Sequence, residues 1–444
     1  MKEELQPLEK SNVTTRSRFK IPFLIASMLT FFVVLIDNIF ADAFMQSSIQ
    51  LTLWMQKVNL KIFSWSFSTV VFSSMFLYVF FMYTIRQDIV KNLILVTGIC
   101  LMVYFQAILK LVFVDWRPVF LNAELNDDFC ICDYGKPSGH VLITSGLALL
   151  IWDDLKLNYN FSKLTEGFLK ALTFLVVVMM GLSRIYMGAH SYNQVIIGIM
   201  FGVTLFFLIR RTEDSISKFI IDPIVFKERS KNKKAVFYIL SILLLMNYGL
   251  LYMWSQQSSR FENITNPFFR FSNCFSCFNE FTLNFSTKVV KESMIFNIIF
   301  GMLLGIYLMP GEHYNFKGLY FDQSIKFYLF RLAFMLIFLS PLVLIYVPKV
   351  KSESLALIKA VVLPIIVGYL ITNPYVFFMN KVDAEFSAPD EKENPSDLSS
   401  IINQTIYEDD LYDEEMKTSR AIKDGDEIKS AKSKIDRDMD ELSI

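Results

Sequence analysis

Long apolar runs recur along the first 380 residues of the chain, and most of them are 18 to 25 residues long. A helix of that length crosses about 30 Å of hydrocarbon, so these runs predict transmembrane helices. The expected spans are residues 21–41, 62–85, 89–113, 138–152, 168–186, 191–210, 235–254, 290–309, 327–347 and 355–379. Residues 45–61 form either an interfacial helix or a loop. The sequence therefore predicts an all-α polytopic membrane protein with about ten transmembrane helices.

The distribution of basic residues predicts how these helices are oriented. The N-terminal tail, residues 1–20, ends in a cluster of Arg and Lys, and residues 212–234 form the most basic connection. Since basic loops remain on the cytoplasmic side, both segments are expected there. The opposite face then receives residues 114–137, 187–190 and 255–289. The first apolar run is longer than the core of a signal peptide, so we expect it to remain as a membrane anchor.

Cysteines and glycosylation sequons bear on the same orientation. Four of the five cysteines fall on the non-cytoplasmic face, namely Cys130, Cys132, Cys274 and Cys277. Disulfides form on that face, and four cysteines allow three pairings; a zinc site and free thiols are the alternatives. Sequons at Asn263 and Asn284 also lie there, but others at Asn12, Asn160 and Asn403 lie on the expected cytoplasmic side. The sequons alone therefore do not decide the orientation.

Composition divides the rest of the chain into regions. Residues 21–211 form a core membrane domain, and residues 235–380 carry four additional expected helices. Residues 381–444 are rich in acidic residues and lack apolar periodicity, which predicts a disordered cytoplasmic tail. The tail either binds cytosolic partners or is a solvated extension. The net charge of the whole chain is zero, and no nucleic-acid partner is expected.

Three polar segments interrupt the apolar pattern of the core. They are KLVFVDWRP at residues 110–118, YGKPSGH at residues 134–140 and GLSRIYMGAHSYNQVIIG at residues 181–198. The orientation derived above brings all three to the same membrane face. Charged groups near lipid are costly and usually functional, so their coincidence at one depth predicts a binding or catalytic site.

The residues in these segments suit a phosphate group. Lys110, Arg117 and Arg184 supply positive charge, and guanidinium groups bind phosphate oxygens in pairs. His140 and His190 supply two imidazoles, of which one can attack phosphorus while the other protonates the leaving oxygen. Taken singly, each residue has a simpler interpretation, as a surface histidine or as a basic side chain that extends toward headgroups. The full constellation favours the phosphate site.

The second segment also predicts a helix N-terminus that can bind an anion. Pro137 is suited to the start of a helix, Ser138 offers a hydroxyl, and Gly139 lets a ligand approach the backbone. Free amides at a helix N-terminus bind phosphate, and His140 would project from the first turn. This segment therefore supplies neutral donors beside the three cations.

The order and spacing of these residues resemble a known family. Lysine followed after six residues by Arg-Pro, then Pro-Ser-Gly-His, then Ser-Arg followed after five residues by histidine, is similar to the three signatures of the type 2 phosphatidic acid phosphatase superfamily. The resemblance covers about residues 60–210. It implies a six-helix phosphatase core that needs no metal and no cofactor.

The resemblance also implies a role for each matching residue. The phosphate-binding set would be Lys110, Arg117, Ser138, Gly139 and Arg184. His190 would be the nucleophile that forms a phosphohistidine, and His140 would be the general acid that protonates the departing alcohol. Water would then release phosphate from His190.

Gln194 departs from the family pattern, which has an aspartate at this position to orient the nucleophilic histidine. One helical turn after His190, the amide oxygen of Gln194 can accept a hydrogen bond from the far ring nitrogen but brings no charge. The serine-protease triad offers a comparison: there, replacing the orienting aspartate with an amide lowers the rate by about 10⁴. The chain is nevertheless similar to glucose-6-phosphatase, an active enzyme with glutamine at the matching place. Gln194 is therefore expected to act with the catalytic residues.

The substrate class follows less directly. Three expected spans before the first signature and a cytoplasmic N-terminus resemble lipid phosphate phosphatases, which favours a phosphatidic acid or sphingoid phosphate. Gln194 favours the alternative of a sugar phosphate. A third alternative is a membrane scaffold that binds phosphate or lipid without turnover. We expect the site to face the lumen of the endoplasmic reticulum or another endomembrane, or the outside of the plasma membrane.

Overall fold

The computed structural model describes the chain in nine stretches: residues 19–85, 89–122, 124–125, 133–225, 241–242, 245–252, 294–308, 325–340 and 353–374. Every regular element within them is a helix, which confirms the all-α fold class. The chain divides into two units, Met1–Asn380 and Lys381–Ile444. The expected acidic tail, the four cysteines of the non-cytoplasmic face and the sequons at Asn263 and Asn284 lie outside the described residues.

The first helix, α2, is longer than the sequence predicted. It runs over Lys20–Gln56 with a kink at Phe40, where the backbone leaves the helical conformation. Residues 45–56 are therefore helical, so the expectation of a loop over this part is wrong and the expectation of a helix is confirmed; no structural observation tests whether that helix is interfacial. Its second half is held by the end of a distant helix: Gln56 Nε2 donates to the carbonyl of Tyr186 at 3.0 Å. Thr52 Oγ1 lies 3.2 Å from the carbonyl of Ile185. Contacts far apart in the sequence therefore extend the helix beyond its apolar run.

The other helices of the core lie over predicted spans, apart from the short α5, which the sequence did not predict, and α8 ends later than predicted. They are α3 at Lys61–Ile85, α4 at Ile89–Phe113, the short α5 at Pro118–Leu121, α6 at Gly139–Asn158, α7 at Lys163–Tyr186 and α8 at Tyr192–Val225. Helix α8 continues into the expected basic loop, residues 212–234, whose last nine residues lie outside the described chain. Helix α6 starts directly after Pro137 and Ser138, as the sequence predicted.

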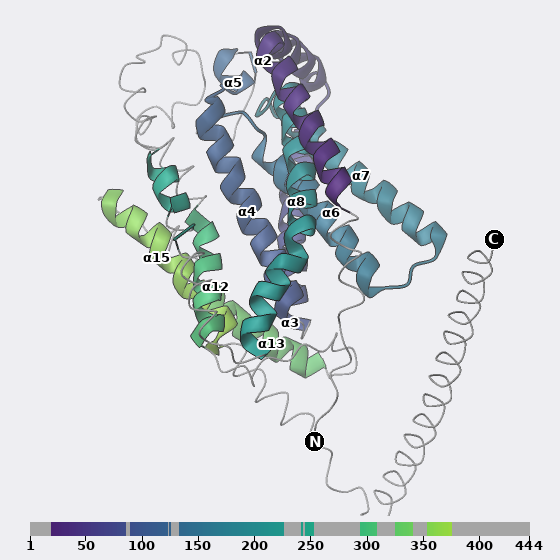
Figure 1. Cartoon of the computed structure of the whole chain (residues 1–444). Coiled ribbons are helices and arrows are strands. Elements are labelled where there is room, and N and C mark those ends of the chain that lie inside the picture. The colour runs from purple at the N-terminus through teal and green to yellow at the C-terminus, as the bar shows by residue number, and fades with distance from the viewer. Residues whose placement is uncertain are drawn as a thin grey trace, which may run out of the picture. The chain divides into compact units, whose positions relative to one another are not determined.

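Helix α8 lies between α2 and α6, and α7 packs against α3 and α6 (Figure 1). The contact between α6 and α8 is close because both helices present glycine there. A Cβ added at Gly202 would lie 2.4 Å from the carbonyl oxygen of Leu142, so only glycine allows this separation. This packing sets the N-terminus of α6 beside the N-terminus of α8, and Ser138 N donates to the carbonyl of Gln194 at 3.1 Å.

The expected C-terminal spans are helical wherever they are described. Residues 241–242 and 245–252 are helical, and the later elements are the 3₁₀ turn η2 at Met294–Phe296, α12 at Asn297–Leu308, α13 at Ile325–Leu339 and α15 at Glu353–Thr372. Helices α12 and α15 pack tightly, because a Cβ added at Gly301 would lie 1.9 Å from the carbonyl oxygen of Ile365. Close backbone contact of this kind is a common means of joining helices in membranes.

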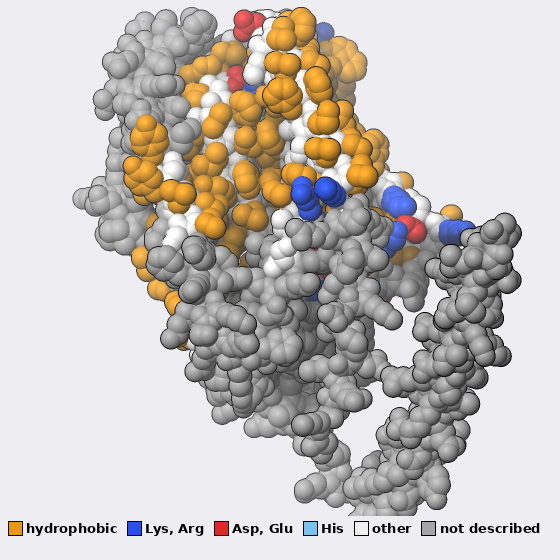
Figure 2. Space-filling view, viewed as in Figure 1, with side chains coloured by type: hydrophobic (Ala, Val, Ile, Leu, Met, Phe, Trp, Pro, Cys, Tyr) orange, Lys and Arg blue, Asp and Glu red, His pale blue; other side chains and the backbone are white. Residues whose placement is uncertain are grey.

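Five helices among the described residues are long and apolar enough to cross a membrane: Lys20–Gln56, Lys61–Tyr83, Lys91–Leu121, Lys163–Tyr186 and Tyr192–Glu213. Shorter apolar helices at Met294–Gly305, Tyr328–Leu339 and Val361–Thr372 coincide with three further predicted spans. Hydrophobic side chains cover much of the described surface in Figure 2. The surface is that of an all-α polytopic membrane protein, although helix α6 and the C-terminal helices are not among the five long spans.

Candidate active site

The three polar segments lie at the ends of helices, and these helix ends lie close to one another in the structure. Lys110 lies in the last turn of α4, and the chain then turns at Val114, whose φ of 48° is uncommon for a β-branched residue. The second segment precedes α6, and the third connects α7 to α8. Gly135 N donates to the carbonyl of Asp115 at 2.8 Å, which joins the first two segments. The structure thus brings together segments that the membrane topology had placed at one face.

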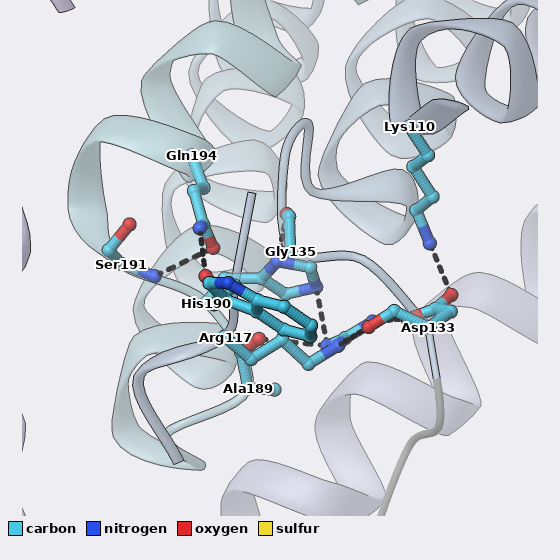
Figure 3. Close-up of polar contacts among 9 residues, drawn as sticks. Lys110, Arg117, Asp133, Gly135, Ala189, His190, Ser191 and Gln194 are labelled. Atoms are coloured by element: carbon cyan, nitrogen blue, oxygen red, sulfur yellow. Dashed lines mark hydrogen bonds and ion pairs between the residues drawn. The ribbon is translucent and has the colours of Figure 1, made fainter. Parts of the chain in front are cut away.

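Arg117 of the first segment contacts the third segment and Asp133, the residue directly before the second segment (Figure 3). Its side chain is 2% exposed. Nε donates to the carbonyl of Asp133 at 2.9 Å, and Nη2 pairs with the carboxylate of the same residue. Nη1 donates to the carbonyl of Ala189 at 2.8 Å and lies 3.1 Å from Nε2 of His190. The guanidinium group therefore lies between a carboxylate and an imidazole, within the site that the sequence predicted.

His190 is held in one tautomer by these contacts. Its Nδ1 lies 2.7 Å from the carbonyl oxygen of Gly135, and a carbonyl can only accept, so Nδ1 carries the hydrogen. Nε2 then has a lone pair, which accepts from Arg117. Burial lowers the pKa of His190 well below its usual value of 6.5, and the positive charges of Arg117, Arg184 and Lys110 lower it further. His190 is therefore neutral at physiological pH, with Nε2 directed at a cation.

The hydrogen bond that we expected between Gln194 and His190 is not formed. The ring nitrogen that Gln194 was expected to orient is Nδ1, and Nδ1 is bonded to the backbone of Gly135 instead. A backbone carbonyl therefore does the orienting that an aspartate does in the family pattern. The physical reason is the close approach of the second segment, which places Gly135 next to both the histidine and the glutamine. Figure 3 shows Gly135 beside the His190 ring.

Gln194 has a different set of partners. Ser191 precedes α8 and Gln194 is its third residue, and Oε1 accepts from Ser191 N at 3.2 Å as in a capping box. Nε2 donates to the carbonyl of Trp116 at 2.7 Å and to the carboxylate of Asp115 at 3.1 Å. A Cβ added at Gly135 would lie 2.6 Å from the Gln194 amide. The Gln194 side chain thus joins the first segment to the start of α8, with Nε2 as the donor and Oε1 as the acceptor.

Ser138 and Gly139 form the start of α6 as predicted. Ser138 is fully buried, and its hydroxyl has no hydrogen-bond partner among the described residues. A buried hydroxyl of this kind is available to a ligand oxygen. A Cβ added at Gly139 would lie 2.4 Å from Nε2 of Gln106 on α4, so a larger residue here would require the Gln106 side chain to move.

The remaining two predicted residues are Arg184 and His140. Arg184 is buried in the last turn of α7, with Nη1 3.8 Å from the sulfur of Met187, and its backbone carbonyl accepts from His190 N at 3.3 Å. His140 is half-buried in the first turn of α6, and its ring centroid lies 4.7 Å from that of Phe72 on α3. The ring of His140 is thus held against an aromatic side chain.

Two acidic residues of this region were missed by the sequence analysis. The carboxylate of Asp133 pairs with both Lys110 and Arg117, and it lies one residue before the segment that we had singled out. Asp37, buried in the middle of α2, pairs with Lys136 and accepts from Asn193 Nδ2 at 2.6 Å. An acid within an expected span was the signal for Asp37. The described residues contain no group of three or more His, Cys, Asp or Glu side chains suited to a metal ion.

Residues 91–216 match the PAP2 superfamily. This part of the chain is therefore similar to the PAP2 superfamily. The match runs from α4 to α8 and contains every predicted site residue, whereas α3, which the sequence resemblance had included, lies before it. No curated protein and no solved structure matches the chain. The match to the PAP2 superfamily supports phosphatase activity, and the apolar helices support an integral-membrane protein.

Proposed function

We propose that this chain is an integral-membrane phosphatase that hydrolyses a phosphate monoester through a phosphohistidine on Nε2 of His190. The observation that carries the proposal is the state of this side chain: Nδ1 is bonded to Gly135, and the Nε2 lone pair lies 3.1 Å from Nη1 of Arg117. A neutral imidazole whose nucleophilic nitrogen faces a buried cation is suited to attack a phosphorus atom bound by that cation.

The reaction follows from the same arrangement. Lys110, Arg117 and Arg184 bind the phosphoryl oxygens and stabilise the charge that spreads over them in the transition state. The Ser138 hydroxyl and the Gly139 amide donate further hydrogen bonds. Nε2 of His190 attacks phosphorus, the bond to the leaving oxygen breaks, and His140 donates a proton to that oxygen. Water, deprotonated by His140, then attacks the phosphohistidine and regenerates His190 with release of phosphate.

A phosphorylated lipid is the substrate that we favour. The phosphate-binding residues lie at the ends of helices whose sides expose large apolar residues, such as Phe168 and Leu182 on α7. A site at the end of an apolar helix lies at the depth of lipid headgroups, where a phosphatidic acid or sphingoid phosphate presents its phosphate. On this proposal the site faces the lumen of an endomembrane compartment or the extracellular side, and cytosolic partners bind the acidic tail.

A sugar phosphate is the second candidate, and it rests on the glutamine that the chain has in common with glucose-6-phosphatase. In this structure Gln194 bonds to the backbone and to Asp115, and these contacts do not distinguish substrates. The third candidate, a scaffold that binds phosphate without turnover, requires the same cations but no nucleophile. The lone pair of His190 favours an enzyme over this alternative.

Hydrolysis by membranes that contain the full chain tests the proposal. Phosphatidic acid, a sphingoid phosphate and glucose 6-phosphate are supplied separately, and phosphate release is measured for the wild type, His190→Ala and Arg184→Gln. Lys170→Gln is the matched control, because Lys170 is an exposed base near the opposite end of α7. We expect the lipid phosphates to be cleaved by the wild type and the control only. Labelled phosphate should be trapped on the wild type as an acid-labile adduct.

Each alternative has its own result in this assay. Cleavage of glucose 6-phosphate alone would select the sugar phosphatase. An absence of cleavage with all three substrates, in a preparation that still binds phosphate, would select the scaffold. Equal cleavage by His190→Ala would refute the histidine nucleophile.

A further inference from the structure

Asp133 places a carboxylate on the cations that the proposed function assigns to phosphate. One oxygen pairs with Nζ of Lys110 and the other with Nη2 of Arg117. All three side chains are buried, with exposed fractions of 2 to 5%. Two oxygens of one anion thus contact an ammonium and a guanidinium group, which is the arrangement that two oxygens of a phosphate would adopt. Figure 3 shows Asp133 between Lys110 and Arg117.

The guanidinium group is surrounded by acceptors. Nε and Nη2 face Asp133, while Nη1 faces the carbonyl of Ala189 and Nε2 of His190. A phosphate that binds Arg117 through two oxygens therefore competes with these acceptors. The backbone carbonyl is fixed by the fold, and His190 must stay close to attack, so the Asp133 carboxylate is the partner that can leave. Phosphate binding at this site is therefore an exchange of one anion for another.

The net charge of the cluster favours phosphate binding, and the Asp133 carboxylate opposes it. Lys110, Arg117 and Arg184 carry three positive charges, and Asp133 carries one negative charge. The cluster remains net positive, so it attracts a phosphate dianion. A buried cation without a counter-ion is costly, and Asp133 removes that cost whenever phosphate is absent. The same interaction opposes binding, since the observed affinity for phosphate is what remains after the carboxylate has been displaced.

We propose that Asp133 is an internal counter-ion of the phosphate site: substrate displaces it from Lys110 and Arg117, and its return after hydrolysis displaces the product. The inference rests on the proposed function for the identity of the ligand. Asp133 touches no reacting atom and acts through the two cations. Its removal should therefore tighten the binding of substrate and product alike, which lowers KM without raising kcat.

A structural role predicts the opposite sign. If Asp133 only held Lys110 and Arg117 in place, its loss would disorder the cations and weaken phosphate binding. The direction of the change in affinity thus separates the two roles, even where both predict a less stable protein in the absence of phosphate.

The test uses purified full-length chain and inorganic phosphate as the probe. The midpoint of phosphate-dependent thermal stabilisation gives an affinity that needs no turnover, and it is measured for the wild type, Asp133→Asn and Asp133→Ser. Two substitutions are used so that the sign does not depend on one side chain. Asp153→Asn is the matched control, since Asp153 pairs with the buried Arg210 at the other end of α6. We expect phosphate to bind both Asp133 variants about tenfold more tightly and the control as it binds the wild type.

Kinetics and binding together keep the two proposals distinguishable. With the substrate that the wild type cleaves, KM and the inhibition constant of phosphate should both fall about tenfold in Asp133→Asn, while kcat does not rise. If no substrate is cleaved but phosphate binds the variants more tightly, the proposed function fails and the internal counter-ion stands. Unchanged or weaker phosphate binding in the variants would overturn the internal counter-ion even if hydrolysis is confirmed.

Discussion

Replacing Gln194 with Glu tests the role that the structure gives to this residue. The two side chains have nearly the same shape, but glutamate is an acceptor only. Gln194 is fully buried and donates from Nε2 to the carbonyl of Trp116 and to the carboxylate of Asp115. In the variant, both donors are lost and a second carboxylate faces Asp115.

The size of the effect can be worked from the distances. Two unit charges at 3.1 Å, the separation of Gln194 Nε2 and Asp115 Oδ2, repel by about 5 kcal/mol at an effective dielectric constant of about 20. The Trp116 carbonyl also loses a donor at 2.7 Å, at a cost of about 1 to 3 kcal/mol. Movement of the two carboxylates relieves part of this repulsion. We therefore expect Gln194→Glu to lower the free energy of unfolding by about 3 kcal/mol or more.

The assay compares thermal unfolding and turnover of the detergent-solubilised chain. Asp115→Asn should rescue Gln194→Glu, because an asparagine amide can donate to the new carboxylate, with a coupling energy of about 2 kcal/mol between the two sites. Gln56→Glu is the matched control. Gln56 on α2 donates to the carbonyl of Tyr186 at 3.0 Å, and the loss of this hydrogen bond should lower the free energy of unfolding by only about 1 kcal/mol.

The opposite result would refute this reasoning. If Gln194 oriented His190 directly, as the sequence had suggested, a carboxylate at position 194 would raise the basicity of the imidazole. Turnover would then rise, the acid limb of the pH profile would shift, and the protein would keep its stability. Such an outcome would show that the Gly135 carbonyl is not the partner of Nδ1 during turnover.

Three further predictions follow from buried groups. Ser138→Ala should leave the thermal stability unchanged or slightly higher, because the hydroxyl has no partner among the described residues, and should raise KM about tenfold; an unchanged KM would exclude a contact with substrate. The pKa of His190 is lowered in the folded protein, so below pH 6.5 this residue takes up a proton in the unfolded chain but not in the folded one. The contribution of His190 to the free energy of unfolding should therefore fall by about 1.4 kcal/mol for each pH unit below 6.5. His190→Gln should flatten that dependence, and an equally steep loss would contradict it. Gly301→Ala should destabilise the contact between α12 and α15 by about 1 to 3 kcal/mol, since the new Cβ would lie 1.9 Å from the Ile365 carbonyl, and leave phosphate affinity unchanged.

The helices of the core could be predicted because their signals are local. Apolar runs of spanning length gave α3, α4, α7 and α8 to within a few residues at most ends, and Pro137 and Ser138 marked the start of α6. The meeting of Lys110, Arg117 and His190 followed from topology, which needs only the order of the spans and one orientation. Chain geometry was enough for these features.

The partners of individual side chains could not be predicted in the same way. Helix α2 extends to Gln56 because of contacts with Tyr186, a residue 130 positions away. His190 Nδ1 donates to a backbone carbonyl, and since every residue has such a carbonyl, the sequence does not indicate which one is the partner. Asp133 was overlooked because the predictions counted cations and neutral donors, and a loop acid near them was not considered as their counter-ion.

Ion pairs lie on both sides of Gly135 in the chain, and this explains how His190 is oriented without an aspartate. Two residues before Gly135, Asp133 pairs with Lys110 and Arg117. Directly after Gly135, Lys136 pairs with Asp37 of α2. The carbonyl that fixes the imidazole tautomer lies between these pairs. Buried ion pairs contribute little net stability, so their effect here is positional. Since α2 lies outside the range that matches the PAP2 superfamily, the orientation of the proposed nucleophile depends on a helix that the family match does not include.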